Sequence, residues 1–392
     1  MSDRLGDSRG LHVVRFAGSN AKRNMPASGV SWFAVGLMQI DRRPLRGPAP
    51  IVWLTGICAM AITLTQVAER AGVSRAAVSR TFTAGASVSA AMRAKVEKAA
   101  TDLGYSPNFL ARGLSTRKTS MIGLVSNNFR NPVFLQIFDL FTRGLQEQGL
   151  RPLLVNLSTE TAPARSVQLL QQYSVDGVIV ASSHLPEGFA KAFRDAGMPV
   201  VHAFGRATRA PEVNVVGIDN EAAGRMAAEA LIARGYRKIG FMGGPETAST
   251  SQDRLSGFIA AAAMHPGVSA TASFAGDYSF SAGFAEMTRL LGGRAAEAYF
   301  CGDDVLSIGA LAAARVAGLH VPRDLGIIGL NDMEMAGWDN IALTTIHQPF
   351  AAIVQSSIEL IRATLAEPDR LPEARILPCR LIERATLRAL QP

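Results

Sequence analysis

The sequence predicts an all-α helix-turn-helix module near the N-terminus, followed by an α/β core of two doubly wound lobes. The chain has 392 residues, 48% of them hydrophobic, which is enough for two or three buried cores. Positive charge is concentrated at one end, because the net charge is +5 over residues 1–60, +6 over 61–120 and −3 over 121–392. The C-terminal part alternates short apolar runs with amphipathic stretches, a pattern typical of parallel sheets with crossover helices.

The charge distribution indicates a small polyanion-binding module joined to a near-neutral domain. A solvated basic surface is the alternative. The three cysteines, Cys58, Cys301 and Cys379, are widely spaced and form no CxxC pair, which favours a reducing compartment over a disulfide framework. No apolar run reaches the roughly eighteen residues that a bilayer span needs. The sequence therefore predicts a cytoplasmic protein with no membrane partner.

Residues 1–60 are interpreted as an unstructured or spurious N-terminal extension, because they show neither helical nor strand periodicity. A basic cluster ahead of the apolar run 51–61 imitates a secretory signal. We set that interpretation aside, since export would place the module described next outside the cell. Translation from Met60 is the alternative to a poorly structured tail.

The helix-turn-helix module is predicted over residues 61–106. Thr63 followed by Gln66 forms a capping-box start to a short amphipathic helix that ends at Gly72. The run 71–74 is then a tight turn, in which the glycine takes a positive φ and Ser74 caps the next helix.

The second helix is predicted from Arg75 to about Phe82, with Val78 and Phe82 facing inward. The outward residues are Arg75, Ala76, Ser79 and Arg80. They fit a recognition helix, because an arginine in the major groove can bond guanine bidentately, for about 1–3 kcal/mol of discrimination. A third helix is predicted from Ser89 to Leu103, with Gly104 just past its end.

Beyond the module, residues 121–392 are predicted to form the two lobes. The expected strands are Ile122–Val125, Leu153–Val155, Gly177–Ala181, Val200–His202, Ile239–Met242, Ala298–Cys301 and Leu325–Gly329. Ligands of open α/β sheets bind at the carboxyl ends of the strands, so a binding cleft is expected there.

An enzyme is not predicted, because the chain has no GxSxG, P-loop, GxGxxG or HExxH motif. The six histidines lack metal-ligand spacing, so no cofactor or metal is predicted. A solute-binding protein of transport is the rival interpretation, and the helix-turn-helix module argues against it.

The module is specific enough in its residues to indicate a family. The runs TLTQVAERAGVS at 63–74, AVSR at 77–80 and LGYSPN at 103–108, together with Arg93 and Val96, closely resemble the headpiece of LacI-type (LacI/GalR) regulators. The resemblance implies a sequence-specific DNA-binding transcription regulator. It further implies a repressor whose operator affinity is controlled by a small-molecule effector such as a sugar.

The resemblance also implies the DNA contacts. The residues implied are Thr63, Ser74, Arg75, Ala76, Ser79, Arg80, Asn108, Ala111 and Leu114. Arg75 and Ala76 would occupy the two positions that set specificity, with Arg80 as a further base contact and the two serines near phosphates. Thr83 departs from the family, which usually has Asn at that position, and this puts one backbone contact in doubt.

Residues 107–120 are expected to form a hinge helix and linker, because 108–114 resembles the family's hinge helix. Leu114 would be the wedge that enters the minor groove, where unstacking one base step costs a few kcal/mol. Gly113 costs about 1 kcal/mol of helix propensity, which suits a segment that folds only on DNA. An ordinary linker is the alternative.

The core resembles the periplasmic-binding-protein-like domain of the same family, in the stretches 216–220, 254–257 and 342–349. The implied effector-binding residues are Asn131, Phe134, Arg254, Tyr278, Asp304 and Asn331. Aromatic faces that stack on C–H surfaces, together with polar groups that bond adjacent hydroxyls, suit a polyhydroxylated ligand. Asp303 departs from the usual Asn, and Val305 stands where a polar contact is possible.

Structural roles are the alternative for these residues. Asp303 and Asp304 would cap the following helix, the two aromatic residues would be core, and Arg254 would pair with Asp253 or another carboxylate. The expected assembly is a homodimer on a pseudo-palindromic, double-stranded operator, with a tetramer as the alternative.

Overall fold

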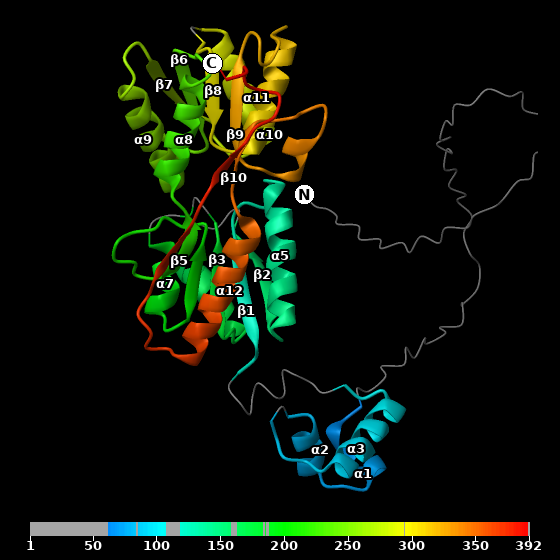
Figure 1. Cartoon of the computed structure of the whole chain (residues 1–392). Helices are drawn as coiled ribbons and strands as arrows, with labels where there is room; N and C mark the ends of the chain where they lie inside the picture. Colours follow the sequence, from blue (N-terminus) through cyan, green and yellow to red (C-terminus); the bar gives the residue numbers. More distant parts are fainter. Residues whose placement is uncertain are drawn as a thin grey trace, which may run out of the picture. The chain divides into compact units, whose positions relative to one another are not determined.

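The computed structural model describes residues 62–83, 85–106, 118–157, 163–182, 185, 188–293 and 295–390. The helical module consists of α1 (Leu64–Ala71), α2 (Arg75–Thr81) and α3 (Ala90–Leu103) (Figure 1). Each helix contributes to one small apolar core, through Val67 from α1, Val78 from α2 and Val96 from α3. Gly72 ends α1 with φ at 60°, the left-handed conformation expected from the sequence.

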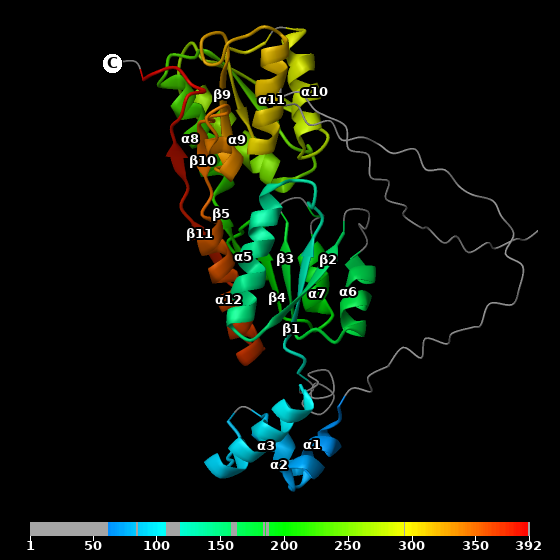
Figure 2. The same cartoon turned by 90° about the vertical axis from the view of Figure 1, so that its right-hand side faces the viewer.

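The first lobe of the core is a six-stranded parallel sheet in the order β11-β5-β4-β3-β1-β2. Its strands are β1 (Met121–Ser126), β2 (Arg151–Asn156), β3 (Gly177–Ala181), β4 (Val200–Ala203), β5 (Asn214–Ile218) and β11 (Ala374–Leu377). Its helices are α5 (Val133–Glu147), α6 (Pro163–Gln172), α7 (Phe189–Asp195) and α12 (Phe350–Ala366). In Figure 2, α5 and α12 cover one face of the sheet, and α6 and α7 cover the other.

Burial on both faces explains why the inner strands β1 and β3 read as continuous apolar runs. Within β1, Ile122 and Leu124 join the core under α5 and α12, whereas Val125 joins the core under α6 and α7. This alternation follows from the two-residue period of a strand.

The second lobe is a six-stranded sheet in the order β12-β10-β9-β8-β6-β7, parallel except that β12 runs antiparallel to β10. Its strands are β6 (Lys238–Gly243), β7 (Ser269–Phe274), β8 (Ala298–Cys301), β9 (Gly326–Asn331), β10 (Thr345–His347) and β12 (Arg380–Ile382). Its helices are α8 (Asn220–Ile232), α9 (Ser249–Ala263), α10 (Phe280–Leu291), α11 (Asp304–Val316) and the 3₁₀ turn η1 (Glu334–Gly337).

Helices of the second lobe pack in pairs, α8 with α9 and α10 with α11. The first pair approaches closely at Gly257, where an added Cβ would lie 1.9 Å from the backbone oxygen of Glu221. Only glycine allows this approach of α9 to α8. Nowhere in the part of the chain that the structure describes does a helix have the length and apolarity needed to cross a membrane.

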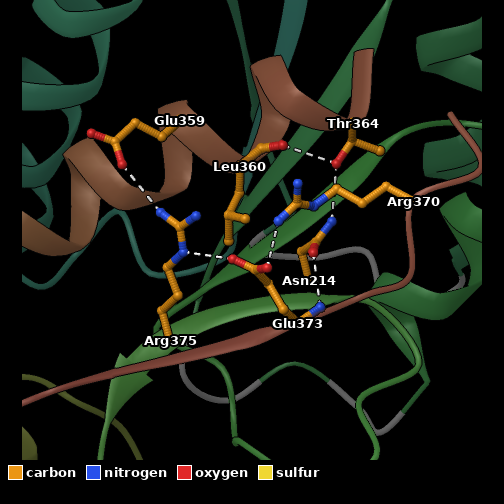
Figure 3. Close-up of polar contacts among 7 residues, drawn as sticks. All are labelled: Asn214, Glu359, Leu360, Thr364, Arg370, Glu373 and Arg375. Atoms are coloured by element: carbon orange, nitrogen blue, oxygen red, sulfur yellow. Dashed lines mark hydrogen bonds and ion pairs between the residues drawn. The ribbon is translucent and has the colours of Figure 1, made fainter. Parts of the chain in front are cut away.

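The chain passes between the lobes after β5, after β10 and after β11 (Figure 1). Polar contacts fasten the start of β11, which precedes the last of these crossings, to β5 and α12 of the first lobe (Figure 3). The Asn214 amide donates to Thr364 Oγ1 (3.1 Å) and accepts from the backbone N–H of Glu373 (3.0 Å). The Glu373 carboxylate pairs with Arg370 (2.6 Å) and Arg375 (2.7 Å), and these guanidinium groups hold the pKa of Glu373 below its usual value.

The structure confirms the fold class and differs from the predicted elements mainly at their ends. The second helix ends at Thr81 rather than Phe82, which is its C-cap. The predicted strands are present, most of them longer by one or two residues. Five strands, β5, β7, β10, β11 and β12, were not predicted. The last three have only three or four residues, and β7 is an edge strand of mostly small and polar residues, whereas β5 is as long and as buried as β3 and was overlooked.

Candidate functional site

Thr63 and Ser74 are the N-cap residues of α1 and α2, and their hydroxyl groups accept backbone hydrogen bonds there. Thr63 Oγ1 accepts from the Gln66 N–H (3.3 Å), while Gln66 Oε1 accepts from the Thr63 N–H (2.8 Å), which completes a capping box. Ser74 Oγ accepts from the Ala77 N–H (3.2 Å). Both caps therefore set where α1 and α2 begin, and with them the direction in which α2 presents its side chains.

The outer face of α2 is the exposed surface that the sequence predicted. Arg75, Ala76, Ser79 and Arg80 are exposed, whereas Val78 on the opposite face is fully buried. Arg80 Nε donates to the Ala76 carbonyl (3.3 Å), so this guanidinium lies along the helix.

Just beyond α2, the Thr83 hydroxyl donates to the Ser79 carbonyl (2.9 Å) and extends the helix end. The other expected DNA contacts, Asn108, Ala111 and Leu114, lie outside the described residues.

A cavity of about 30 Å³ lies between the lobes at the carboxyl ends of the strands. Side chains that follow strands of both sheets line it. They are Asn128, Val133, Phe134, Ile137, Phe204, Ile218, Asn220, Arg254, Tyr278, Asp303, Asn331, Gln348 and Phe350. The first lobe contributes mainly aromatic and aliphatic groups, and the second contributes most of the polar groups. The volume is about that of one or two water molecules.

Arg254 is the cation of this cavity. Its side chain, 5% exposed, donates from Nε to Asn220 Oδ1 (2.8 Å) and from Nη1 to the Gly302 carbonyl (2.7 Å). Its expected alternative partner, Asp253, pairs instead with Arg206 Nη2 (2.6 Å). Arg254 is thus fixed at the cavity wall by two neutral acceptors.

Asp303 is the acidic group of the cavity. Its Oδ2 accepts from the amides of Asn131 and Asn331, each at 2.9 Å, and its Oδ1 accepts from the Val305 N–H (2.8 Å). Asp303 is therefore the N-cap of α11, as the structural alternative expected, and it also lines the cavity, a role that the sequence analysis did not assign to it. Burial raises the pKa of Asp303 to about 6, against the opposing effect of these donors.

Asp304, which the sequence placed in the cleft, is fully buried and does not line the cavity. Its carboxylate accepts from Thr345 Oγ1 (2.6 Å) and from the Met333 N–H (2.9 Å). Burial raises the pKa of Asp304 to about 7. The helix turn at α11 directs Asp303, and not its neighbour, toward the cavity.

The remaining expected residues surround the cavity in different ways. Phe134 packs edge-on against Phe204, with ring centroids 6.3 Å apart. Tyr278 is 2% exposed, and its hydroxyl lies 2.8 Å from Ser251 Oγ. Asn331 lines the cavity, whereas Asn131 reaches it only through its bond to Asp303.

Sequence reasoning missed four polar residues of the lining, namely Asn128, Asn220, Asp303 and Gln348. Gln348 lies within the quoted stretch 342–349, and Asn220 ends the stretch 216–220, so both were within reach of the resemblance. The Oε1 atom of Gln348 is buried and has no hydrogen-bond partner among the described residues.

Comparison with known proteins identifies both parts of the chain. Residues 63–108 match the family described as bacterial regulatory proteins, lacI family, and residues 228–387 match a periplasmic binding protein-like domain. The chain is 33% identical over 325 residues to the HTH-type transcriptional regulator CelR of Thermobifida fusca, covering 79% of this chain and 94% of that protein. It is 31% identical to the HTH-type transcriptional repressor PurR of Proteus mirabilis (strain HI4320), covering 83% and 96%.

Solved structures give the same result. The lac repressor dimer bound to operator and the anti-inducer ONPF superposes with a TM-score of 0.75 at 27% identity, covering 84% of this chain and 99% of that one. A complex of the transcriptional regulator CelR with cellobiose gives 0.62 at 29% identity, covering 83% and 99%.

Proposed function

This chain belongs to the lacI family of bacterial regulatory proteins, and from that premise we propose that it is a transcriptional repressor whose affinity for an operator is set by a small-molecule effector. The carrying observation is that one chain combines the exposed face of α2 with a two-lobed core that encloses a polar cavity. The relatives that share both parts are named as transcriptional regulators or repressors, and one structure contains operator DNA.

We propose that residues 61–106 form the DNA-binding domain and 107–120 the hinge. Arg75 and Ala76 set base specificity, Arg80 adds a further base contact, and the caps at Thr63 and Ser74 position the helices against phosphates. Exposure of all these residues supports the assignment. Asn108, Ala111 and Leu114 complete the DNA contacts, with Leu114 as the minor-groove wedge.

We propose that residues 121–392 bind the effector and form the dimer. The effector is a neutral polyhydroxylated metabolite. An apolar first-lobe wall at Phe134 suits its C–H face, and Arg254, Asp303 and Asn331 suit its hydroxyls. The opposite charges of Arg254 and Asp303 offset each other, which favours a neutral ligand. Tyr278 and Asn131 keep the cavity walls in position through their contacts with Ser251 and Asp303.

The proposed assembly is a homodimer, and its proposed location is the cytoplasm, where the operator DNA lies. No catalytic role is proposed, since the relatives are named as regulators. Among the described residues, no group of three histidine, cysteine or acidic side chains is placed to hold a metal ion.

DNA selection with the purified full chain tests the regulator role. Random duplexes retained at physiological salt should yield a pseudo-palindromic site, bound at least about a thousandfold more tightly than random DNA. The genes next to that site indicate which metabolites to test. The affinity of the protein for each metabolite is then measured with and without the DNA site, and these two affinities must differ by the same factor by which the metabolite changes the affinity for DNA. If no sequence is enriched and the protein is recovered from the periplasm, a solute-binding role replaces the proposed one.

A further inference from the structure

Two of the polar contacts between described residues join the lobes directly. Asn131, which precedes α5 in the first lobe, donates to Asp303 of the second lobe at 2.9 Å. Arg206, in the loop after β4 of the first lobe, pairs with Asp253 on α9 of the second lobe at 2.6 Å. Both contacts must break when the lobes separate.

The two contacts differ in their relation to the cavity. Asp303 lines the cavity, so a ligand bound there competes for its carboxylate. Arg206 and Asp253 are both absent from the lining, so a ligand in the cavity does not contact their ion pair.

Asp253 is unlike an ordinary surface carboxylate. Only 10% of its side chain is exposed, and Arg206, 54% exposed, is the group that pairs with it. Glu221 on α8 also faces it and repels it, while the neighbouring Arg254 attracts it. A buried carboxylate that loses its cationic partner is strongly unfavourable, so the position of Arg206 matters to Asp253 more than exposed pairs usually do.

Consecutive residues of α9 thus perform separate tasks. The Arg254 side chain enters the cavity, and the Asp253 side chain holds the first lobe. Any shift of α9 that follows from a ligand on Arg254 is therefore transmitted to the ion pair with Arg206.

We propose that the Arg206–Asp253 ion pair is a tether between the lobes that holds the effector cleft closed and sets its balance between closed and open forms. The tether rests on the proposed function in one respect, namely that the cavity is the effector site. Because the tether lies outside the cavity, it regulates the response without selecting the effector.

Hydrogen exchange on the intact full-length protein, with no DNA or metabolite added, tests the tether. The reporters are peptides containing the amides of Val133 and Val305, which bond to the two partners of the cleft contact. Arg206→Glu and Asp253→Arg should each speed exchange there by about fivefold or more, and the double variant Arg206→Glu/Asp253→Arg should return it to within about twofold of the parent. Arg209→Glu, in the same exposed loop, is the charge-matched control and should change nothing.

Exchange in β3 serves as the fold control. If either charge-reversal variant also speeds exchange in β3, the neutral variants Arg206→Gln and Asp253→Asn are used in its place. They too should speed exchange at the cleft peptides. The proposal is overturned if the folded single variants exchange at the cleft peptides as slowly as the parent does. It is also overturned if the double variant exchanges there as fast as Asp253→Arg. If the DNA selection fails, the regulator role is rejected. The exchange experiment contains no DNA or metabolite, so its result tests the tether independently of that role.

Discussion

The Nδ1 atom of His347 lies 3.0 Å from Oδ2 of Asp332, whose other oxygen lies 2.6 Å from Nη2 of Arg384. His347 ends β10 just before the chain crosses to the first lobe, and Arg384 follows β12 just after it returns. Asp332 therefore joins two of the crossing segments at the second lobe. It also follows the cavity residue Asn331, and both have positive φ, 58° and 129°, which only surrounding contacts can maintain.

Replacing Asp332 with Ala should lower the free energy of unfolding by about 2 kcal/mol, because the largely buried guanidinium of Arg384 loses its carboxylate. Urea denaturation measures this loss. Asp339→Ala, an exposed change a few residues away, should cost less than about 0.5 kcal/mol. Equal losses in the two variants would contradict the role given to Asp332.

Arg75→Ala should weaken binding to the selected operator by about 1–3 kcal/mol and relax preference at one base pair of each half-site. Fluorescence anisotropy against operator and random duplexes measures both effects. Lys98→Ala removes the same charge from an exposed position on α3 and serves as the matched control. A uniform loss on both DNAs in Arg75→Ala would indicate a phosphate contact instead.

Arg254→Met should abolish the response to any metabolite that changes operator affinity in the parent, while operator affinity itself stays within about threefold. The reason is that Arg254 lines the cavity, where it bonds to Asn220 and the Gly302 carbonyl, so a ligand in the cavity meets its guanidinium. Operator titrations with and without the metabolite give the result. A retained response would remove Arg254 from the effector site.

Asp304→Asn should flatten the dependence of stability on pH. Burial raises the pKa of Asp304 to about 7 in the folded chain, above that of the unfolded chain, so folded protein binds more protons between about pH 4 and 7. Stability contributed by the protonated group is present below pH 4 and falls as pH rises toward 7. Thermal unfolding measured across this range should show a smaller fall in the variant, since an amide can replace the protonated acid toward Thr345 and Met333.

Gly257→Ala should destabilise the chain by about 2 kcal/mol or more, because its Cβ would meet the backbone of α8, which cannot yield as a flexible side chain does. Gly276→Ala, where a Cβ meets nothing within 4 Å, is the control and should be close to neutral. Unfolding midpoints in urea compare the two. Similar midpoints would mean that α8 and α9 can separate without cost.

Local chemistry made the helical module predictable. The caps at Thr63 and Ser74 and the turn at Gly72 depend on hydrogen bonds to residues no more than four positions away. The sequence alone is therefore enough to place them. Strands buried on both faces, such as β3, were equally clear because every residue is apolar. The edge strand β7 escaped prediction because only one of its six residues is buried and most of them are small or polar.

The cavity was less predictable, because its members meet only through the tertiary fold. Asp303 and Asp304 are adjacent in sequence, and only the direction of the α11 cap decides which one reaches the cavity. The pairing of Asp253 with Arg206 joins residues 47 positions apart on different lobes. No periodicity in the sequence points to such a partner.

The small volume between the lobes has a kinetic consequence. A space of about 30 Å³ admits no sugar, so a metabolite reaches Arg254 only during the moments when the walls part. Association should then follow gated kinetics: the observed rate rises with metabolite concentration and levels off at the frequency of spontaneous parting. That plateau would be a property of the protein alone, identical for every compound it accepts.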